Sequence, residues 1–219
     1  MNGQTAVAPN APAKKNKPKE RLYTIEEYLA MEETSLVNHE FDNGKLIPMA
    51  GGTPTHSEIK ASVVMALGIL ARQSKKSCRV FNSDIRIYLP VFKKGVMPDA
   101  AVVVGKTDFS IEHPVGLLLN PTLIVEVLSD GTESYDRGEK FARYRTLPSL
   151  EEYVLVSQNA PRVETFVKQD GRWFINETAE GLDAKVELFA LGVKLPLKEI
   201  YWNVSFEEEK PNKKRAKKK

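Results

Sequence analysis

One glutamate stands inside an otherwise apolar segment of the sequence. Glu126 lies in NPTLIVEVLSD, residues 120–130, where a leading proline, β-branched residues and a following Ser-Asp-Gly predict a buried β-strand. An ionised carboxylate in a dry interior is costly unless a positive partner neutralises it. The segment therefore predicts a cation beside Glu126, which is either a bound metal ion or a basic side chain.

A second carboxylate opens the strand pattern that comes before it. Asp99 follows Pro98 and begins the run DAAVVV, while Glu126 shares one strand face with Ile124 and Leu128 by the two-residue repeat. If the two strands are neighbours, both carboxylates reach one point at a sheet edge, where they repel each other unless a proton or a divalent cation intervenes. Mg²⁺ is a suitable cation, because it takes one or two carboxylates together with waters and substrate phosphate.

Hydrolysis of a phosphodiester also requires a positioned water and a positive group near the developing charge. Lys140, in a helical segment that follows the Glu126 strand, is the best candidate for that group, and Glu40 is a possible third acid. Two simpler interpretations stay open. Glu126 could form a structural salt bridge with Lys140 or an arginine, and Asp136 with Lys140 could be an ordinary surface pair one helical turn apart.

The segments around these residues alternate between helical and strand patterns. Helical patterns cover residues 24–32, 55–76 and 134–147, and strand or hairpin patterns cover residues 39–49, 79–90, 97–105, 120–130, 151–158, 162–177 and 184–201. Thr24 and Thr55 each precede a glutamate by three residues, which predicts a capping box at the start of both helices. Asn43-Gly44 and Asp170-Gly171 predict tight hairpin turns. This order predicts an α/β protein with a mixed sheet.

The composition predicts one domain between two basic tails. The chain has 219 residues, a length that suits one domain with a sizeable core. We assign residues 1–20 and 206–219 to disordered tails and residues 21–205 to the domain. No apolar stretch approaches the roughly 20 residues of a membrane span, and nothing resembles a signal peptide. Cys78 is the only cysteine, which excludes an internal disulfide and a cysteine-rich zinc site, so we expect a cytoplasmic protein without a membrane partner.

The net charge of +3 conceals an uneven distribution. Residues 1–21 and 210–219 together hold 12 of the 32 basic residues, whereas residues 22–209 hold 20 basic and 28 acidic residues. Lysine-rich tails attract nucleic acid without sequence preference, or they simply keep a protein soluble. The acidic body favours cations over phosphate at its own surface.

Three segments carry a resemblance to a known family. They are HEFDNGKLIPMAGGTPTHSEI, MPDAAVVV and NPTLIVEVLSDGTESYDRGEKFARYRTLPSLEEYVLV. Together they resemble the Uma-two family of predicted restriction endonucleases within the PD-(D/E)xK nuclease superfamily, over about residues 22–204. The resemblance implies a restriction-endonuclease-like fold, with a mixed β-sheet flanked by helices and additional β-hairpins.

The same resemblance implies roles for individual residues. Asp99 and Glu126 would hold a metal ion, and the backbone carbonyl of Val127 would add a ligand. Glu40 matches an acidic residue of the family. His56 matches a histidine of the family that could help to position substrate, and the alternative, which the sequence favours, is an ordinary surface histidine at the start of a helix. The superfamily pattern expects a lysine two positions after the glutamate, where this chain has leucine. The displaced lysine of the family would then be Lys140.

Two functions from different classes follow. The first is a metal-dependent DNA endonuclease that uses Mg²⁺, or Mn²⁺ as a substitute, and works as a homodimer. The second is a nucleic-acid-binding or interaction protein with a relict nuclease site. A sugar- or nucleotide-binding enzyme is disfavoured, because the sequence contains no glycine-rich phosphate loop with its lysine.

Overall fold

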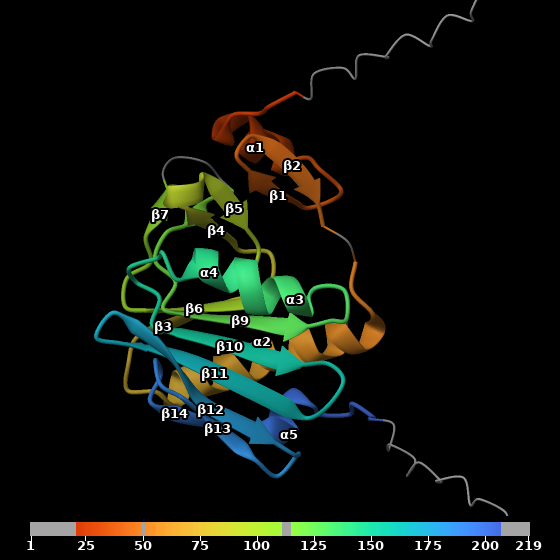
Figure 1. Ribbon diagram of the computed structural model, residues 1–219, viewed down its shortest axis with the longest axis vertical. Helices are drawn as coiled ribbons and strands as arrows, with labels where there is room; N and C mark the ends of the chain where they lie inside the picture. The colour runs from red at the N-terminus through yellow and green to blue at the C-terminus, as the bar shows by residue number, and fades with distance from the viewer. Residues whose placement is uncertain (1–20, 50, 111–114, 207–219) are drawn as a thin grey trace, which may run out of the picture.

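Two mixed β-sheets with helices on their faces make up the fold (Figure 1). The computed structural model describes residues 21–49, 51–110 and 115–206. The predicted tails, residues 1–20 and 206–219, lie outside these ranges except for residue 206. The α/β class and the mixed sheet flanked by helices are as predicted, and no helix in the described ranges is long and apolar enough to cross a membrane.

The first sheet has the strand order β2-β1-β5-β4-β8-β7. Its strands are β1 (His39–Asp42), β2 (Lys45–Pro48), β4 (Arg86–Leu89), β5 (Lys94–Val96), β7 (Phe109–Ser110) and β8 (Leu117–Leu118). The β1–β2 hairpin turns at Asn43-Gly44, where both residues have positive φ, as the sequence predicts. Helix α1 (Ile25–Glu32) covers this part and begins with the predicted capping box at Thr24.

The second sheet contains the central strands of the molecule, in the order β12-β11-β10-β9-β6-β3. Its strands are β3 (Cys78–Phe81), β6 (Ala100–Val104), β9 (Leu123–Leu128), β10 (Glu152–Ser157), β11 (Arg162–Gln169) and β12 (Arg172–Glu180). Strand β9 runs parallel to β10 and antiparallel to β6. A further hairpin of β13 (Lys185–Leu188) and β14 (Val193–Pro196), followed by α5 (Leu197–Ile200), packs against α2.

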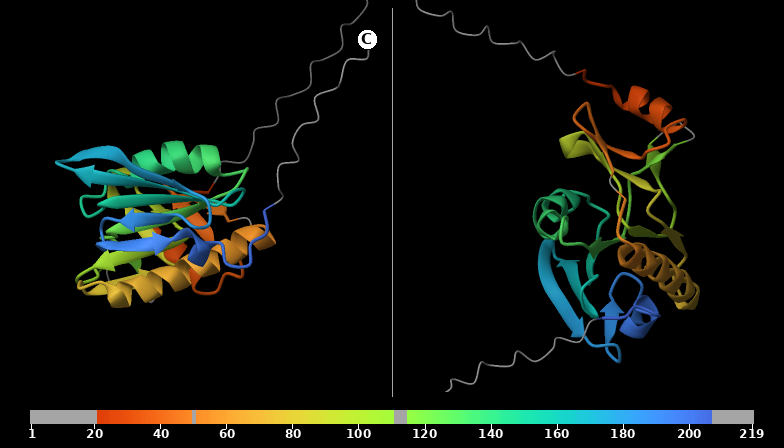
Figure 2. Two further views of the ribbon diagram at one scale, coloured as in Figure 1. Left: turned by 90° about the horizontal axis from the view of Figure 1, so that it is seen from below. Right: turned by 90° about the vertical axis from the view of Figure 1, so that its right-hand side faces the viewer.

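Helices cover both faces of the second sheet (Figure 2). Helix α2 (Pro54–Gln73) lies on one face, and the crossover between β9 and β10 lies on the other. The crossover consists of α3 (Glu133–Tyr135), the π-helical turn η2 (Asp136–Lys140) and α4 (Phe141–Tyr144). A short 3-10 helix, η1 (Pro90–Phe92), connects β4 to β5.

The start of α2 differs from the prediction. The N-cap is Thr53, whose side chain accepts a hydrogen bond from the His56 N–H, and not Thr55. Pro54 explains the difference, because proline has no backbone N–H to leave unpaired and its fixed φ suits the first helical position. The helix therefore begins two residues earlier than the capping-box pattern suggests.

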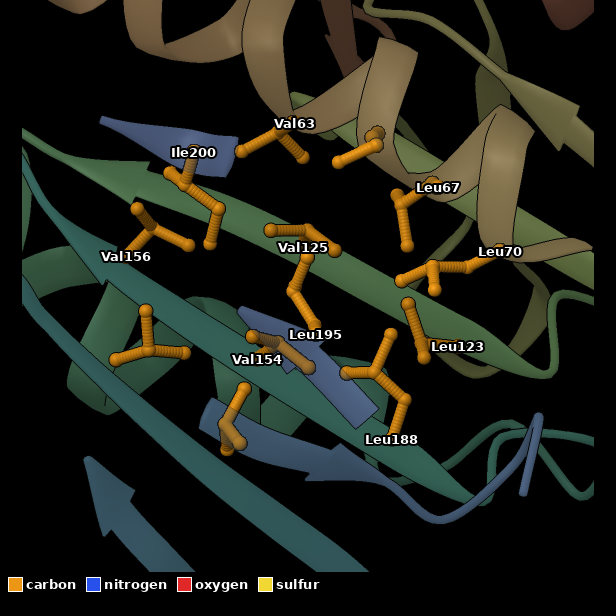
Figure 3. Close-up of a cluster of buried hydrophobic side chains, with 14 of the residues drawn as sticks. Val63, Leu67, Leu70, Leu123, Val125, Val154, Val156, Leu188, Leu195 and Ile200 are labelled. Carbon is orange, nitrogen blue, oxygen red and sulfur yellow. The ribbon is translucent and has the colours of Figure 1, made fainter. Parts of the chain in front are cut away.

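The alternation along β9 divides its side chains between two cores. Leu123, Val125 and Val127 pack with α2, and Figure 3 shows Val63 and Leu67 of that helix facing β9 and β10. On the opposite face, Ile124 and Leu128 join a core built with the crossover helix. Glu126 has the same parity as Ile124 and Leu128, so its carboxylate faces the crossover helix and not α2.

A second buried glutamate, Glu152, stands at the other end of the central strands. It is fully buried at the start of β10, and it accepts hydrogen bonds from the backbone N–H groups of Phe189 (3.2 Å) and Ala190 (2.9 Å). Burial raises the pKa of Glu152 from 4.5 to about 7, in spite of these two hydrogen bonds. The folded protein thus holds this proton more tightly than the unfolded chain does.

This pKa predicts a pH-dependent stability. The stabilisation from the bound proton is fully present below about pH 4.5 and is lost as the pH rises through about 7. At about 1.4 kcal/mol per pKa unit, the free energy of unfolding should fall by roughly 3 kcal/mol across this range. Urea unfolding at pH 5 and pH 8 measures the change, and Glu152→Gln, which cannot titrate at this position, should show a change that is smaller by this contribution. An equal change in both proteins would contradict the assignment.

Candidate functional site

The two predicted metal carboxylates lie side by side where the two sheets meet. Residues 97–99 connect β5 of the first sheet to β6 of the second, so Asp99 stands at this junction. Strand β6 pairs with β9, with Ala100 opposite Val125, which confirms that the two strands are neighbours. The backbone N–H of Val127 donates a hydrogen bond of 2.6 Å to Asp99 Oδ2. Asp99 is thereby held against the strand that carries Glu126.

Glu126 is buried and has two polar partners on the crossover helix. It is 2% exposed, its Oε1 lies 2.8 Å from Lys140 Nζ, and the Tyr144 hydroxyl donates to the same oxygen at 3.1 Å. Burial raises the pKa of Glu126 well above its ordinary range, and the charges of Asp99 and Asp136 add to this effect while Lys140 opposes it. The cation that the sequence required beside Glu126 is, in this structure, the Lys140 ammonium.

Lys140 is a buried residue with three acceptors. Besides Glu126, its Nζ lies 3.5 Å from Asp136 Oδ1 and donates to the Met97 carbonyl at 3.3 Å. Burial disfavours the charged ammonium, but the carboxylates of Glu126 and Asp136 outweigh it and raise the pKa of Lys140. Asp136 and Lys140 are 3% and 6% exposed, so the interpretation of this pair as an ordinary surface pair is wrong.

Local helix geometry places these side chains. Asp136 and Lys140 are the first and last residues of η2, and Tyr144 ends α4. Their spacing of four residues puts them on one helix face, and that face turns toward β9. A π-helical turn is rare and is found frequently at functional sites.

Asp99 is bound from the other side of the sheet by α2. Its Oδ1 lies 2.8 Å from Lys60 Nζ and 3.7 Å from His56 Nε2. Burial disfavours the ionised carboxylate, yet the neighbouring His56 ring and the Lys60 ammonium lower the pKa of Asp99 to about 2. The ring of His56 packs so closely on Gly52 that a Cβ there would approach its Cδ2 to 2.7 Å, and its buried Nδ1 has no hydrogen-bond partner in the described part of the chain.

Glu40 lies behind the carboxylate pair. It is 6% exposed, accepts a hydrogen bond of 3.4 Å from the Met97 N–H, and lies 3.7 Å from Lys94 Nζ. The Met97 carbonyl accepts a hydrogen bond from Lys140, so the backbone of Met97 connects Glu40 to the buried Lys140–Glu126 ion pair. Lys94 is itself buried and bonds to the Tyr135 hydroxyl at 3.0 Å. The structure thus brings Glu40 close to the site through Met97.

A pocket of about 520 Å³ opens onto this arrangement. Its wall is formed by the loop before α2, the first turns of α2, residues 97–99 and the segment from Glu126 to Lys140. The charged and titratable residues that line it are His56, Lys60, Asp99, Glu126, Asp130, Asp136 and Lys140. Glu40 is not among the described lining residues, so its carboxylate acts on the pocket through Met97 and through its charge, which helps to raise the pKa of Lys140.

The ligand chemistry suits a hard divalent cation that keeps some of its own water. Asp99 and Glu126 offer carboxylate oxygens on adjacent strands, which is the donor type and number that Mg²⁺ commonly takes from a protein. Within residues 21–49, 51–110 and 115–206, no three His, Cys, Asp or Glu residues cluster closely enough to hold a metal by themselves. A cation held by these two carboxylates would take its remaining ligands from water and substrate.

Three residues of this arrangement were absent from the predicted set: Lys60, Tyr144 and Lys94. Helical spacing could have indicated two of them, because Lys60 lies one turn after His56 and Tyr144 one turn after Lys140. Lys94 lies in another sheet, and no local pattern connects it to the site.

Comparisons with known proteins identify the family of the chain. Residues 25–198 match the family Uma2, which is described as "Putative restriction endonuclease". Two uncharacterised proteins of Synechocystis sp. are similar, one 33% identical over 92% of this chain and 99% of its own length, the other 34% identical over 76% and 93%.

A solved structure shares the fold. The crystal structure of a protein from Anabaena variabilis, described as a "putative nuclease", superposes with a TM-score of 0.62 at 17% identity, covering 81% of this chain and 97% of that one. The predicted resemblance is thereby confirmed for both the family and the fold. The chain belongs to the Uma2 family of restriction-endonuclease-like proteins.

Proposed function

We propose that this protein is a metal-dependent endonuclease that hydrolyses phosphodiester bonds in DNA. The observation that carries the proposal is the buried Glu126 on a central strand, beside Asp99, at the wall of an open pocket. Asp99, Glu126 and the Val127 carbonyl would hold Mg²⁺, or Mn²⁺ in its place. When bound, the metal would activate a water and stabilise charge on the phosphate.

The protein's own residues prepare the site for this reaction. Lys140 and Tyr144 fix the orientation of Glu126, and Lys140 carries the positive charge that the superfamily places two residues after the glutamate. The Val127 N–H fixes Asp99. Glu40 positions Met97 and adds negative charge behind Lys140. His56 lies beside Asp99 at the wall of the pocket, where it could help to position substrate.

The raised pKa of Glu126 adds a condition to this proposal. Burial favours the protonated carboxyl, and a divalent cation binds the ionised form. A bound cation would therefore compete with this proton, and the Lys140 ammonium already favours the ionised form.

A second function is supported by one specific observation. Both acids already have an ammonium partner from the chain, Lys60 on Asp99 and Lys140 on Glu126, so the arrangement can be neutralised without a metal. A nucleic-acid-binding protein with a relict nuclease site would have this geometry too. The two proposals differ in whether a divalent cation binds at Glu126.

The partners follow from the proposed reaction. DNA would be the substrate, and two copies of the chain could present one site to each strand of a duplex. A homodimer in the cytoplasm is therefore the state that we propose for the working protein.

A metal titration tests the proposed function. Mg²⁺ or Mn²⁺ at about 100 times its dissociation constant stabilises a folded protein by about 2.7 kcal/mol, which for a domain of this size raises the melting temperature by roughly 5–10 °C. We expect this shift in the unmodified protein and none in Glu126→Gln. Glu152→Gln is the matched control, since it removes another buried glutamate of the same sheet and should keep the shift. A full shift in Glu126→Gln would show that the metal binds elsewhere.

A further inference from the structure

Lys60 occupies a more open position than the other lysine of the site. Its side chain is 28% exposed, against 7% for Lys140. Lys60 lines the pocket that contains Glu126 and also two further pockets, of about 580 Å³ and about 330 Å³. Asp99 lines all three pockets as well. The Lys60 ammonium thus lies where three hollows of the surface meet.

The two lysines also differ in how their hydrogen-bond donors are used. An ammonium has three N–H donors. Lys140 has three acceptors around it, from Glu126, Asp136 and Met97, so it cannot donate to a substrate without giving one of them up. In the described part of the chain, Lys60 contacts one acceptor, Asp99 Oδ1. Two of its donors are therefore available to a ligand in the pockets.

The position of Lys60 on Asp99 has a second consequence. A divalent cation at Asp99 and an ammonium at 2.8 Å from the same carboxylate repel each other strongly at such short range. Lys60 sits on a flexible stem at the edge of open space, so it can move away, whereas Lys140 is 6% exposed and is held by three acceptors. Metal binding should therefore release Lys60 from Asp99 toward the pockets.

We propose that Lys60 is the residue that contacts the substrate phosphate, and that in the metal-free protein the same ammonium neutralises Asp99. The inference rests on the proposed function and adds a second lysine to it, with a different task from Lys140. The ligand class is a phosphodiester of a nucleic-acid strand. The strand would pass over Lys60 and place its next nucleotide in the 580 Å³ pocket, between α2 and the turn that contains Asn82 and Ser83.

The proposal predicts effects of opposite sign on two ligands. Lys60→Met removes the ammonium that competes with metal, so Mn²⁺ should bind about fivefold more tightly, the effect of losing one partly exposed ion pair. The same substitution removes a phosphate contact, so a short DNA duplex should bind several-fold more weakly in Ca²⁺, which occupies oxygen-ligand sites. A residue with a purely structural role would weaken both or neither.

Calorimetric Mn²⁺ titration of the full chain and fluorescence anisotropy with labelled DNA measure the two effects. Arg72→Met is the matched control, because it removes a positive charge from the far end of the same helix and should leave Mn²⁺ affinity unchanged. Lys60→Gln repeats the comparison if Lys60→Met fails to fold. If the Lys60 variant binds Mn²⁺ no more tightly than the Arg72 variant does, the inference about Lys60 is wrong and the proposed function still stands. Absence of Mn²⁺ binding in every protein overturns the proposed function with it.

Discussion

Replacing Lys140 with methionine should lower the free energy of unfolding by about 3–5 kcal/mol, the cost of leaving one partner of a buried ion pair without the other. Methionine keeps the length of the side chain, so the lost charge and not a lost volume dominates the effect. Glu126 and Asp136 are 2% and 3% exposed, and both contact the Lys140 ammonium. Urea unfolding at neutral pH measures the loss.

A double substitution separates this explanation from general damage to the core. Glu126→Gln with Lys140→Met removes both charges of the closest pair, so it should recover a large part of the stability that Lys140→Met loses. Arg145→Met, at the exposed end of the same helix, is the control and should cost no more than about 1 kcal/mol. Equal losses in the single and the double variant would contradict the buried-pair explanation.

The stability of the Lys140 variants does not distinguish an active nuclease from a protein with a relict site. A buried Lys140–Glu126 pair is expected for an active nuclease and also for the structural salt bridge that the sequence left open. What distinguishes the two is whether Glu126 and Asp99 bind a metal and whether DNA is cut.

The sequence predicts the centre of the site well because the signals there are local. A charge among β-branched residues is costly enough to require a partner, and the two-residue repeat tells which neighbours share its face. Pro98-Asp99 marks the start of a strand, and that strand, β6, pairs with β9, the next long strand along the chain. Lys140 reaches Glu126 because the helix between two parallel strands must pack back on the sheet.

Other parts of the arrangement depend on packing that no local pattern contains. Helical spacing groups Asp136 with Lys140 but does not say which way that face turns, so a buried pair looked like a surface pair. Lys60 lies on α2, and it contacts Asp99 because α2 crosses the sheet with the turn that contains Lys60 beside Asp99. The division of the strands into two sheets is also hidden, because Pro98-Asp99 marks the start of a strand but does not tell that the strand belongs to another sheet.

The isosteric variant Asp99→Asn tests the central claim. Asparagine can still accept the hydrogen bond from the Val127 N–H, but it lacks the charge that would hold a divalent cation. Asp130→Asn provides the control, since Asp130 lines the same pocket and bonds to Asn159 rather than to the carboxylate pair. The two variants remove equal charge from one pocket and differ in the role that we assign.

Cleavage of supercoiled plasmid DNA with Mg²⁺ or Mn²⁺ is the most direct measurement. We predict nicking by the unmodified protein that stops when the metal is chelated. Asp99→Asn should be slower by at least about 100-fold, on the order of what removing one preorganised charge-stabilising group costs, and Asp130→Asn should cut at close to the original rate. Metal-independent nicking, or equal rates for Asp99→Asn and the unmodified protein, would contradict the assignment of Asp99 and Glu126 as the catalytic centre.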